Sequence, residues 1–250
     1  MRDRLPHPLT PSAGASGDDR EPGGAPRVRL LPRPLVVVVA VLALVACWAA
    51  AIHLREASSL PGSRFDAAWA VRIDAHHTHF RDVVANTIAV VGGAPGGVLV
   101  DLGVATLVLV LRGRAALLTM LAALGLNEVD VLALKWVSER HPPGSSGLYL
   151  GFLGSFPSGH TANAAVVVVS VGLLARRLLV WVGGAGYVAV MGLDRTYLDA
   201  HWVTDTIAGA VAGAATAALI WCIAQPRITR RRTPLTPAHD RRPPPAEPGR

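Results

Sequence analysis

Two short stretches in the second half of the chain hold residues that can transfer a phosphoryl group. Pro157-Ser158-Gly159-His160 opens an apolar segment, so the Ser158 hydroxyl and the amides of a Gly-containing turn lie at a predicted helix N-terminus. Such a terminus is an anion site. His201 and Asp205 are four residues apart at the start of another apolar segment and therefore share one helical face. The carboxylate can hold the imidazole tautomer that leaves a nitrogen free for attack.

Cationic side chains accompany these stretches. Arg195 precedes His201 by six residues across a short predicted loop and can clamp the phosphate bound at the Ser158 turn. Lys135 is the only lysine of the chain and lies at the end of an apolar segment. Hydrolysis of a phosphate ester without a metal needs anion ligands, a nucleophile, a group that orients it and an acid for the leaving oxygen. The chain offers a residue for each of these tasks.

The composition predicts the elements that position these residues. Charged residues make up only 16% of the chain and hydrophobic residues 51%, whereas a soluble domain carries about 25% charged residues. The charges are concentrated at the two ends. We therefore expect a membrane-embedded domain over residues 34–225, between disordered tails at 1–33 and 226–250. The net charge of +7 does not indicate nucleic acid, because basic residues beside membrane spans mark the cytoplasmic face.

The predicted fold class is all-α, a polytopic membrane bundle of about six transmembrane helices. The 83–111 stretch is broken by glycines and predicts a short helix or re-entrant piece before its span, while the polar segment 55–82 predicts an extramembrane stretch that can include an interfacial helix. No disulfide is expected between Cys47 and Cys222, which lie near opposite ends of the domain. The predicted spans are 35–54, 97–111, 115–134, 160–175, 178–194 and 203–224.

Arginines in the short loops predict the orientation in the membrane. Arg112 and Arg114 join the second and third spans, Arg176 and Arg177 join the fourth and fifth, and the tails are basic. By the positive-inside rule this side is the cytoplasm, so both termini are predicted to be cytoplasmic. The candidate residues then gather at the extracytoplasmic face of the cell (plasma) membrane. Ionisable residues are costly at membrane depth, so their convergence on one face indicates a functional site.

The combined spacing of these residues resembles the type 2 phosphatidic acid phosphatase family, which shares its core site with vanadium haloperoxidases. The second motif of that family is matched in full by Pro157 to His160. The third is matched at Arg195, His201 and Asp205, with Asp194 in place of a serine. The resemblance extends from about residue 60 to residue 224.

The first motif of the family is matched only in part. Lys135 and Pro143 stand at the expected positions, but Pro142 occupies the place of an arginine. Arg140, two residues earlier, is either a replacement for the missing guanidinium or a solvated loop charge.

The resemblance implies a role for each candidate. His201 attacks phosphorus and forms a phosphohistidine, Asp205 orients it, and His160 protonates the leaving alcohol and later activates water. The implied substrate is a lipid phosphate or diphosphate, phosphatidate-like or polyprenyl, and neither a metal nor a cofactor is implied. The phosphate-binding residues are Lys135, Ser158, Gly159 and Arg195, with Arg140 as a further candidate.

Two other functions remain open at this stage: a phosphotransferase that passes the phosphoryl group to an acceptor lipid, and a non-catalytic membrane protein that binds lipid phosphate. A soluble haloperoxidase would not need six spans. Glu128 and Asp130 either line the pocket or make an interhelical hydrogen bond. The His76-His77-Thr78-His79 run invites a metal hypothesis, but we predict a solvated face because no carboxylate or cysteine partner is evident nearby. The expected partners are membrane lipids and not nucleic acid, and no oligomeric state is predicted.

Overall fold

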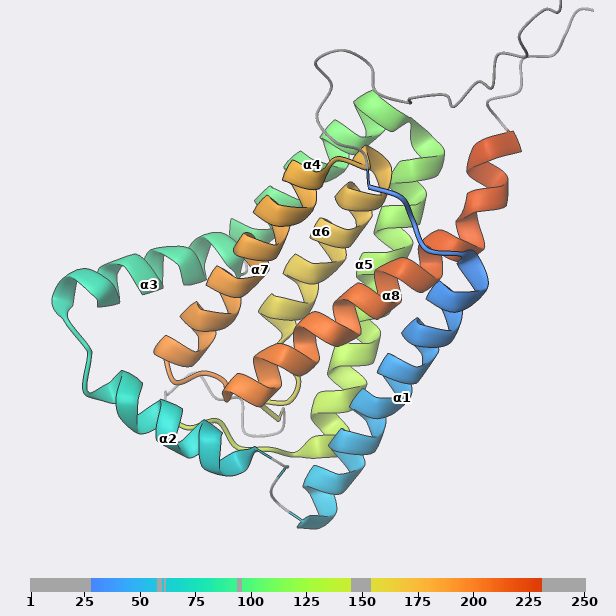
Figure 1. Ribbon diagram of the computed structural model, residues 1–250. Helices are drawn as coiled ribbons and strands as arrows, with labels where there is room; N and C mark the ends of the chain where they lie inside the picture. The colour runs from blue at the N-terminus through green and yellow to red at the C-terminus, as the bar shows by residue number, and fades with distance from the viewer. Residues whose placement is uncertain (1–27, 58–59, 61, 94–95, 145–153, 231–250) are drawn as a thin grey trace, which may run out of the picture.

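The structure, a computed structural model, describes residues 28–57, 60, 62–93, 96–144 and 154–230 (Figure 1). Its described residues form an all-helical bundle, so the predicted fold class is confirmed. The predicted tails lie outside these ranges for residues 1–27 and 231–250. The helices are α1 (Arg33–Ala57), α2 (Ser63–Asp74), α3 (His79–Gly92), α4 (Gly96–Arg112), α5 (Arg114–Ser138), α6 (Gly159–Ala175), α7 (Leu178–Tyr197) and α8 (Val203–Arg230).

The chain is a multi-pass membrane protein. Among the described helices α1, α5, α7 and α8 are long and apolar enough to cross a membrane, and α3 with α4 passes the same test as a pair bent by 52°. The apolar helix α6 has 17 residues and is shorter. Length and composition thus support four or five spans, and the predicted count of six also requires α6. Large apolar side chains such as Val38, Leu102 and Leu179 are exposed on the outside of these helices, as expected for a surface in contact with lipid.

Several predicted boundaries shift by a few residues. The helix expected before the second span is α3, which begins at His79 rather than near residue 83. Its start is explained by Thr78, whose hydroxyl accepts a hydrogen bond from the Arg81 amide as an N-cap. The predicted extramembrane segment contains α2. At the other end α8 continues to Arg230, beyond the domain boundary predicted at residue 225.

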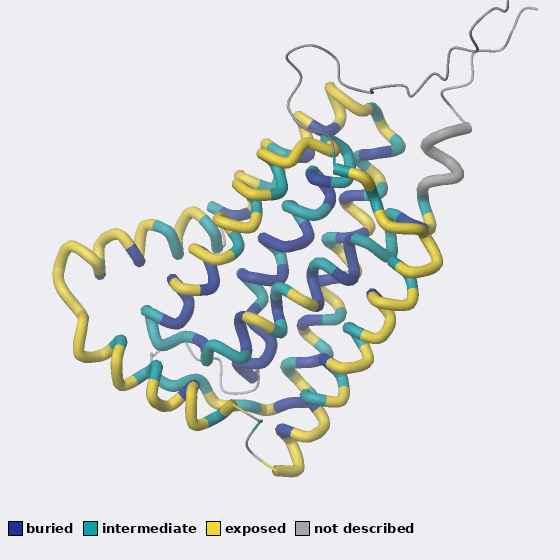
Figure 2. The backbone as a smooth tube through the Cα atoms, in the orientation of Figure 1, coloured by how far each residue is buried: buried dark blue, intermediate teal, exposed yellow. Residues whose placement is uncertain are grey.

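Helices α6 and α8 pack closely along the centre of the bundle, where Figure 2 shows most of the buried backbone. Gly209 and Gly213 on α8 permit this approach. A Cβ atom at either position would collide with the backbone of α6, at the carbonyl oxygens of Ser158 and Ala162 respectively. Small residues spaced four apart commonly let membrane helices approach in this way. The contact brings the beginning of α8, with His201 just before it, beside the beginning of α6.

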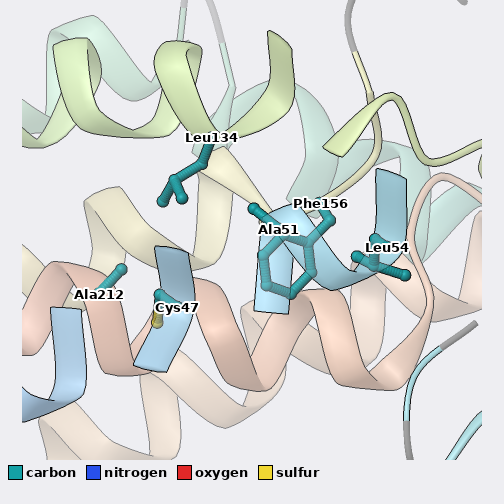
Figure 3. Packing of buried hydrophobic residues seen from close by; sticks show 6 residues of the cluster. All are labelled: Cys47, Ala51, Leu54, Leu134, Phe156 and Ala212. Atoms are coloured by element: carbon teal, nitrogen blue, oxygen red, sulfur yellow. The ribbon is translucent and has the colours of Figure 1, made fainter. Parts of the chain in front are cut away.

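A hydrophobic cluster fixes the loop that leads into α6 (Figure 3). Phe156, only 1% exposed, packs against Ala51 and Leu54 of α1, Leu134 of α5 and Ala212 of α8. A buried aromatic ring of this size contributes about 2–3 kcal/mol through the burial of its apolar surface. The cluster thereby anchors the residues that immediately follow, Pro157 to His160.

The two ends of the bundle differ in what they carry (Figure 1). At one end α1 begins and α8 ends, and the α4–α5 and α6–α7 turns with their arginines lie there too. The opposite end holds α2, the ends of α5 and α7, and the beginnings of α6 and α8. All the predicted site residues belong to this second end.

Candidate active site

His201 lies in the short connection between α7 and α8 and is 9% exposed. Its Nδ1 atom is 2.7 Å from the carbonyl oxygen of Ser155. A carbonyl oxygen can only accept a hydrogen bond, so in this arrangement the proton is on Nδ1 and the free lone pair is on Nε2. The ring is therefore held in the tautomer that a nucleophilic imidazole requires.

Asp205 lies one helical turn beyond His201 and is fully buried. Its Oδ2 atom accepts a hydrogen bond from the Trp202 amide at 3.0 Å and lies 3.8 Å from His201 Nδ1. At 3.8 Å the expected contact between Asp205 and His201 is longer than a hydrogen bond, and the ring donates its hydrogen bond to the carbonyl of Ser155 instead. Asp205 holds the beginning of α8 on which His201 depends.

The protonation of His201 follows from its surroundings. Burial lowers the pKa of His201 below the usual 6.5, and the nearby Lys135 cation lowers it further, against the opposing effect of Asp205. Because desolvation disfavours the charged ring, His201 is neutral at neutral pH. A neutral ring is the form that can attack phosphorus.

The turn before α6 is hydrogen-bonded to the start of α8, so the Pro157–His160 motif directly contacts the motif that contains Asp205. Ser158 is fully buried, and its amide donates to the carbonyl oxygen of Asp205 at 2.9 Å. Its hydroxyl makes no capping hydrogen bond and accepts only from Thr161 Oγ1, at 3.1 Å. The first amides of α6, from Gly159 onward, have no acceptor within the helix. This turn therefore presents a hydroxyl and backbone donors of the kind that bind phosphoryl oxygens.

His160 follows in the first turn of α6, with Arg195 beside it. The Nη1 atom of Arg195 lies 3.5 Å from His160 Nε2. His160 also lies close to Gly93 at the end of α3, where an added Cβ atom would lie 2.6 Å from His160 Nε2. Glycine at this position thus leaves the space that the imidazole occupies.

Arg195 is itself 7% exposed and paired with its neighbour in the sequence. Its Nε and Nη2 atoms donate to Asp194 Oδ2 at 3.0 and 2.5 Å. Asp194 is the residue that replaces the serine of the family motif. Its carboxylate holds two nitrogens of the guanidinium and leaves Nη1 directed toward His160.

Lys135, near the end of α5, reaches the segment that precedes the Ser158 turn. Its Nζ atom donates to the carbonyl oxygens of Gly154 at 2.8 Å and Ser155 at 3.5 Å. Lys135 therefore contacts the Ser155 carbonyl, the same group that orients His201. An ammonium group has three donors, so these contacts leave capacity for an anion.

The side chain of Arg140 is only 8% exposed, so it is not a solvated loop charge. Its Nη2 atom donates to Asp66 at 2.9 Å, and Nη1 contacts Thr204 Oγ1 at 2.7 Å and Asp205 Oδ1. The guanidinium also stacks over the Trp202 ring, 5.4 Å from its centroid. Both terminal nitrogens are thus directed at carboxylates.

Two residues outside the motifs complete these contacts, and sequence reasoning missed both. Ser155 contributes only backbone groups, which any residue type except proline would supply. Asp66 comes from α2, remote in the sequence. The signal that could have revealed it is an acidic residue in an otherwise exposed amphipathic helix, but one further acidic residue, Asp74, and two arginines in that helix obscure it.

For Asp130 of α5 the sequence offered two roles, lining the pocket or making an interhelical hydrogen bond. Its Oδ1 atom accepts a hydrogen bond from Trp48 Nε1 of α1 at 2.9 Å, so the interhelical hydrogen bond is confirmed. Glu128 is exposed on the surface of α5.

The expectation that the histidine run lacks carboxylate partners was wrong. His77 Nδ1 lies 2.9 Å from Asp82 Oδ1, and its ring stacks on Tyr197 with centroids 4.4 Å apart. Potential ligand atoms of His77, Asp74 and Asp199 lie within 4.8 Å of one another. The turn after α2 and the loop after α7, which carries Asp199, bring these residues together, which spacing alone does not indicate. They are largely exposed, and we assign no metal to them.

Comparison with known proteins agrees with this geometry. Residues 114–229 match the model of the PAP2 superfamily, so the predicted resemblance to the type 2 phosphatidic acid phosphatases is confirmed. The chain is also similar to the crystal structure of a transmembrane PAP2-type phosphatidylglycerolphosphate phosphatase from Bacillus subtilis, with a TM-score of 0.61 and 23% identity over 73% of this chain and 96% of that one. No curated protein sequence matches the chain.

Proposed function

We propose that this chain hydrolyses a lipid phosphate or diphosphate, with His201 as the nucleophile. The observation that carries the proposal is the contact of His201 Nδ1 with the Ser155 carbonyl, which leaves Nε2 free. Nε2 attacks phosphorus, a phosphohistidine forms, and the bond to the leaving oxygen breaks. His160 supplies the proton to that oxygen and then takes a proton from the water that releases phosphate.

The phosphoryl oxygens are held by donors that converge on this end of the bundle. The Ser158 hydroxyl and the amide of Gly159 bind from the turn, with Arg195 Nη1 and Lys135 Nζ on either side. These fixed cationic and dipolar groups supply the charge stabilisation of the transition state. We therefore propose metal-independent turnover. Arg140, whose nitrogens contact carboxylates, acts through Asp205 and not on the phosphate.

The active site faces the extracytoplasmic side in this proposal, and both termini of the 34–225 phosphatase domain lie in the cytoplasm. The arginine-bearing turns at the opposite end support it by the positive-inside rule. Single cysteines replacing exposed Glu139 at the site end and exposed Arg114 at the other end test the orientation. A membrane-impermeant thiol reagent applied to intact cells should label only the first, and labelling of only the second would reverse the orientation.

The substrate proposed is a membrane lipid, because the donors lie at the end of a bundle that exposes many large apolar side chains. Phosphatidate and polyprenyl diphosphate are candidates. The similar Bacillus subtilis protein is a phosphatidylglycerolphosphate phosphatase, which makes phosphatidylglycerol phosphate a third candidate. A screen of purified protein in detergent for phosphate release from these three lipids, with and without chelator, tests the proposal. Release that requires a divalent ion would contradict the metal-independent mechanism.

A second candidate, a non-catalytic protein that binds lipid phosphate, is favoured by one observation. The cations Arg195, Lys135 and Arg140 all have protein partners, and two nitrogens of Arg195 are held by Asp194. Binding of phosphatidate without any phosphate release would support this candidate. Formation of a new phospholipid when an acceptor alcohol is added would instead indicate a phosphotransferase.

A further inference from the structure

Asp66 lies outside every motif and outside the matched family region, yet it is among the most buried residues of the molecule. It belongs to the first turn of α2 and is 1% exposed, the one buried residue of that helix. A carboxylate is buried to this extent only when it is paired with a cation and hydrogen-bonded. Its partners therefore show what α2 is anchored to.

Those partners are Arg140 and the first turn of α8. Asp66 Oδ2 accepts from Arg140 Nη2 at 2.9 Å and from Thr204 Oγ1 at 2.6 Å, and Oδ1 accepts from the Thr204 amide at 3.0 Å. The Thr204 amide is one of the helix-start donors that have no acceptor within α8. Asp66 thus caps α8 from a different helix while it holds one side of the Arg140 guanidinium.

Arg140 connects Asp66 to His201 by two routes. Through its side chain, Nη1 contacts Asp205 Oδ1, and the other oxygen of Asp205 holds the Trp202 amide next to His201. Through its backbone, the Arg140 carbonyl accepts from the Ser155 amide at 2.6 Å, and the Ser155 carbonyl faces His201 Nδ1 at 2.7 Å. A shift of Arg140 therefore moves both groups that determine the position of the imidazole.

We propose that Asp66 is a positioning residue for the nucleophile: by anchoring α2 to Arg140 and Thr204, it keeps the Asp205 carboxylate and the Ser155 carbonyl in register with His201. The inference rests on the proposed function of His201. With Asp66 neutralised, the guanidinium keeps a single carboxylate partner, Asp205, and is drawn toward it. A misplacement of about 1 Å in a reacting group lowers the rate on the order of 100-fold.

The test compares Asp66→Asn with Asp74→Asn, which removes a carboxylate from the exposed last residue of the same helix. Turnover of phosphatidate in detergent micelles and inhibition by inorganic phosphate are measured. Asp66→Asn should lower kcat by about 10- to 100-fold and leave KM and phosphate inhibition nearly unchanged, whereas Asp74→Asn should match the wild type. Equal kcat in the two variants would overturn the inference, and so would a loss confined to KM and phosphate inhibition.

A second pair of variants covers the case in which Asp66→Asn does not fold. Thr204→Val removes the hydroxyl that bridges Asp66 and Arg140 but keeps the shape of the side chain, while Thr204→Ser keeps the hydroxyl. The first should lose kcat and the second should retain it; equal turnover would refute the positioning role.

Hydrogen exchange separates this inference from the proposed function. The amides of residues 201–206 should exchange faster in Asp66→Asn than in Asp74→Asn, even if no lipid phosphate is hydrolysed by the wild type. Unchanged exchange would overturn the positioning role. A wild type without turnover but with faster exchange in Asp66→Asn would contradict only the proposed function.

Discussion

Replacing Arg140 with alanine should destabilise the fold as well as the site. The guanidinium is 8% exposed and is the shared partner of two carboxylates, those of Asp66 and Asp205, which are 1% and 0% exposed. Removing it leaves both carboxylates buried without a cation. Breaking a buried ion pair by deleting one partner costs about 3–5 kcal/mol, because the remaining charge stays desolvated.

The chain offers a matched control for this substitution in Arg55. This side chain is 51% exposed and lies 3.7 Å from Glu139, itself 61% exposed. An exposed pair of this kind contributes about 0–1 kcal/mol. Arg140→Lys should have an intermediate stability, because an ammonium keeps the charge but lacks the planar guanidinium that bridges two carboxylates.

The assay is the free energy of unfolding, measured by titration with dodecyl sulfate in mixed micelles and followed by helical circular dichroism. Arg140→Ala should lose several kcal/mol more than Arg55→Ala, and Arg140→Lys should fall between them. Turnover of the folded fraction should also drop, because Asp205 and the Ser155 carbonyl lose their common anchor. If Arg140→Ala and Arg55→Ala were equally stable, the buried carboxylate–guanidinium network would be refuted.

Three further predictions concern the remaining parts of the site. His160→Ala should lower turnover of a lipid substrate severely, and much less with an aryl phosphate whose leaving group needs no proton; equal losses on both substrates would contradict the acid role. Gly93→Ala should lower kcat, because its Cβ would lie 2.6 Å from His160 Nε2. Gly103→Ala on α4, where a Cβ meets nothing within 4 Å, should leave kcat unchanged. A larger loss of kcat in Gly103→Ala than in Gly93→Ala would contradict the predicted crowding of His160. Burial lowers the pKa of His201, so the neutral nucleophile persists below pH 6.5 and is lost only as the pH falls through the lowered value. The acidic limb of kcat/KM should therefore have its midpoint below 6.5, and a midpoint above that value would show a charged, solvated ring.

The sequence predicted the helical membrane fold and the convergence of its motifs for clear physical reasons. Long apolar runs can bury their backbone polar groups in lipid only as helices, and the Pro157–His160 and Arg195–Asp205 motifs begin or end such runs. The close approach of α6 and α8 had a local signal too, in Gly209 and Gly213 four residues apart, although its partner helix could not be deduced from spacing.

The contacts that determine the site were less predictable, because they depend on residues brought together from distant parts of the chain. From the sequence alone Arg140 could be a phosphate ligand or a loop charge. Its contact with Asp66, 74 residues earlier in the chain, depends on the fold. His201 donates its hydrogen bond to a backbone carbonyl, which carries no sequence signal. The carboxylates near His77 likewise come from Asp82 across a turn and Asp199 from another loop.

The most direct test of the central claim, attack by His201, is to identify the residue that carries the phosphoryl group. Purified His160→Ala enzyme, slowed in the release of phosphate, is mixed with an aryl phosphate labelled in its phosphoryl group and quenched in alkali, where a phosphohistidine survives. Peptide mapping should find the label on His201, and the His160→Ala/His201→Ala protein should carry none. Label on any other residue, or wild-type turnover by the His201→Ala enzyme, would contradict the proposed mechanism.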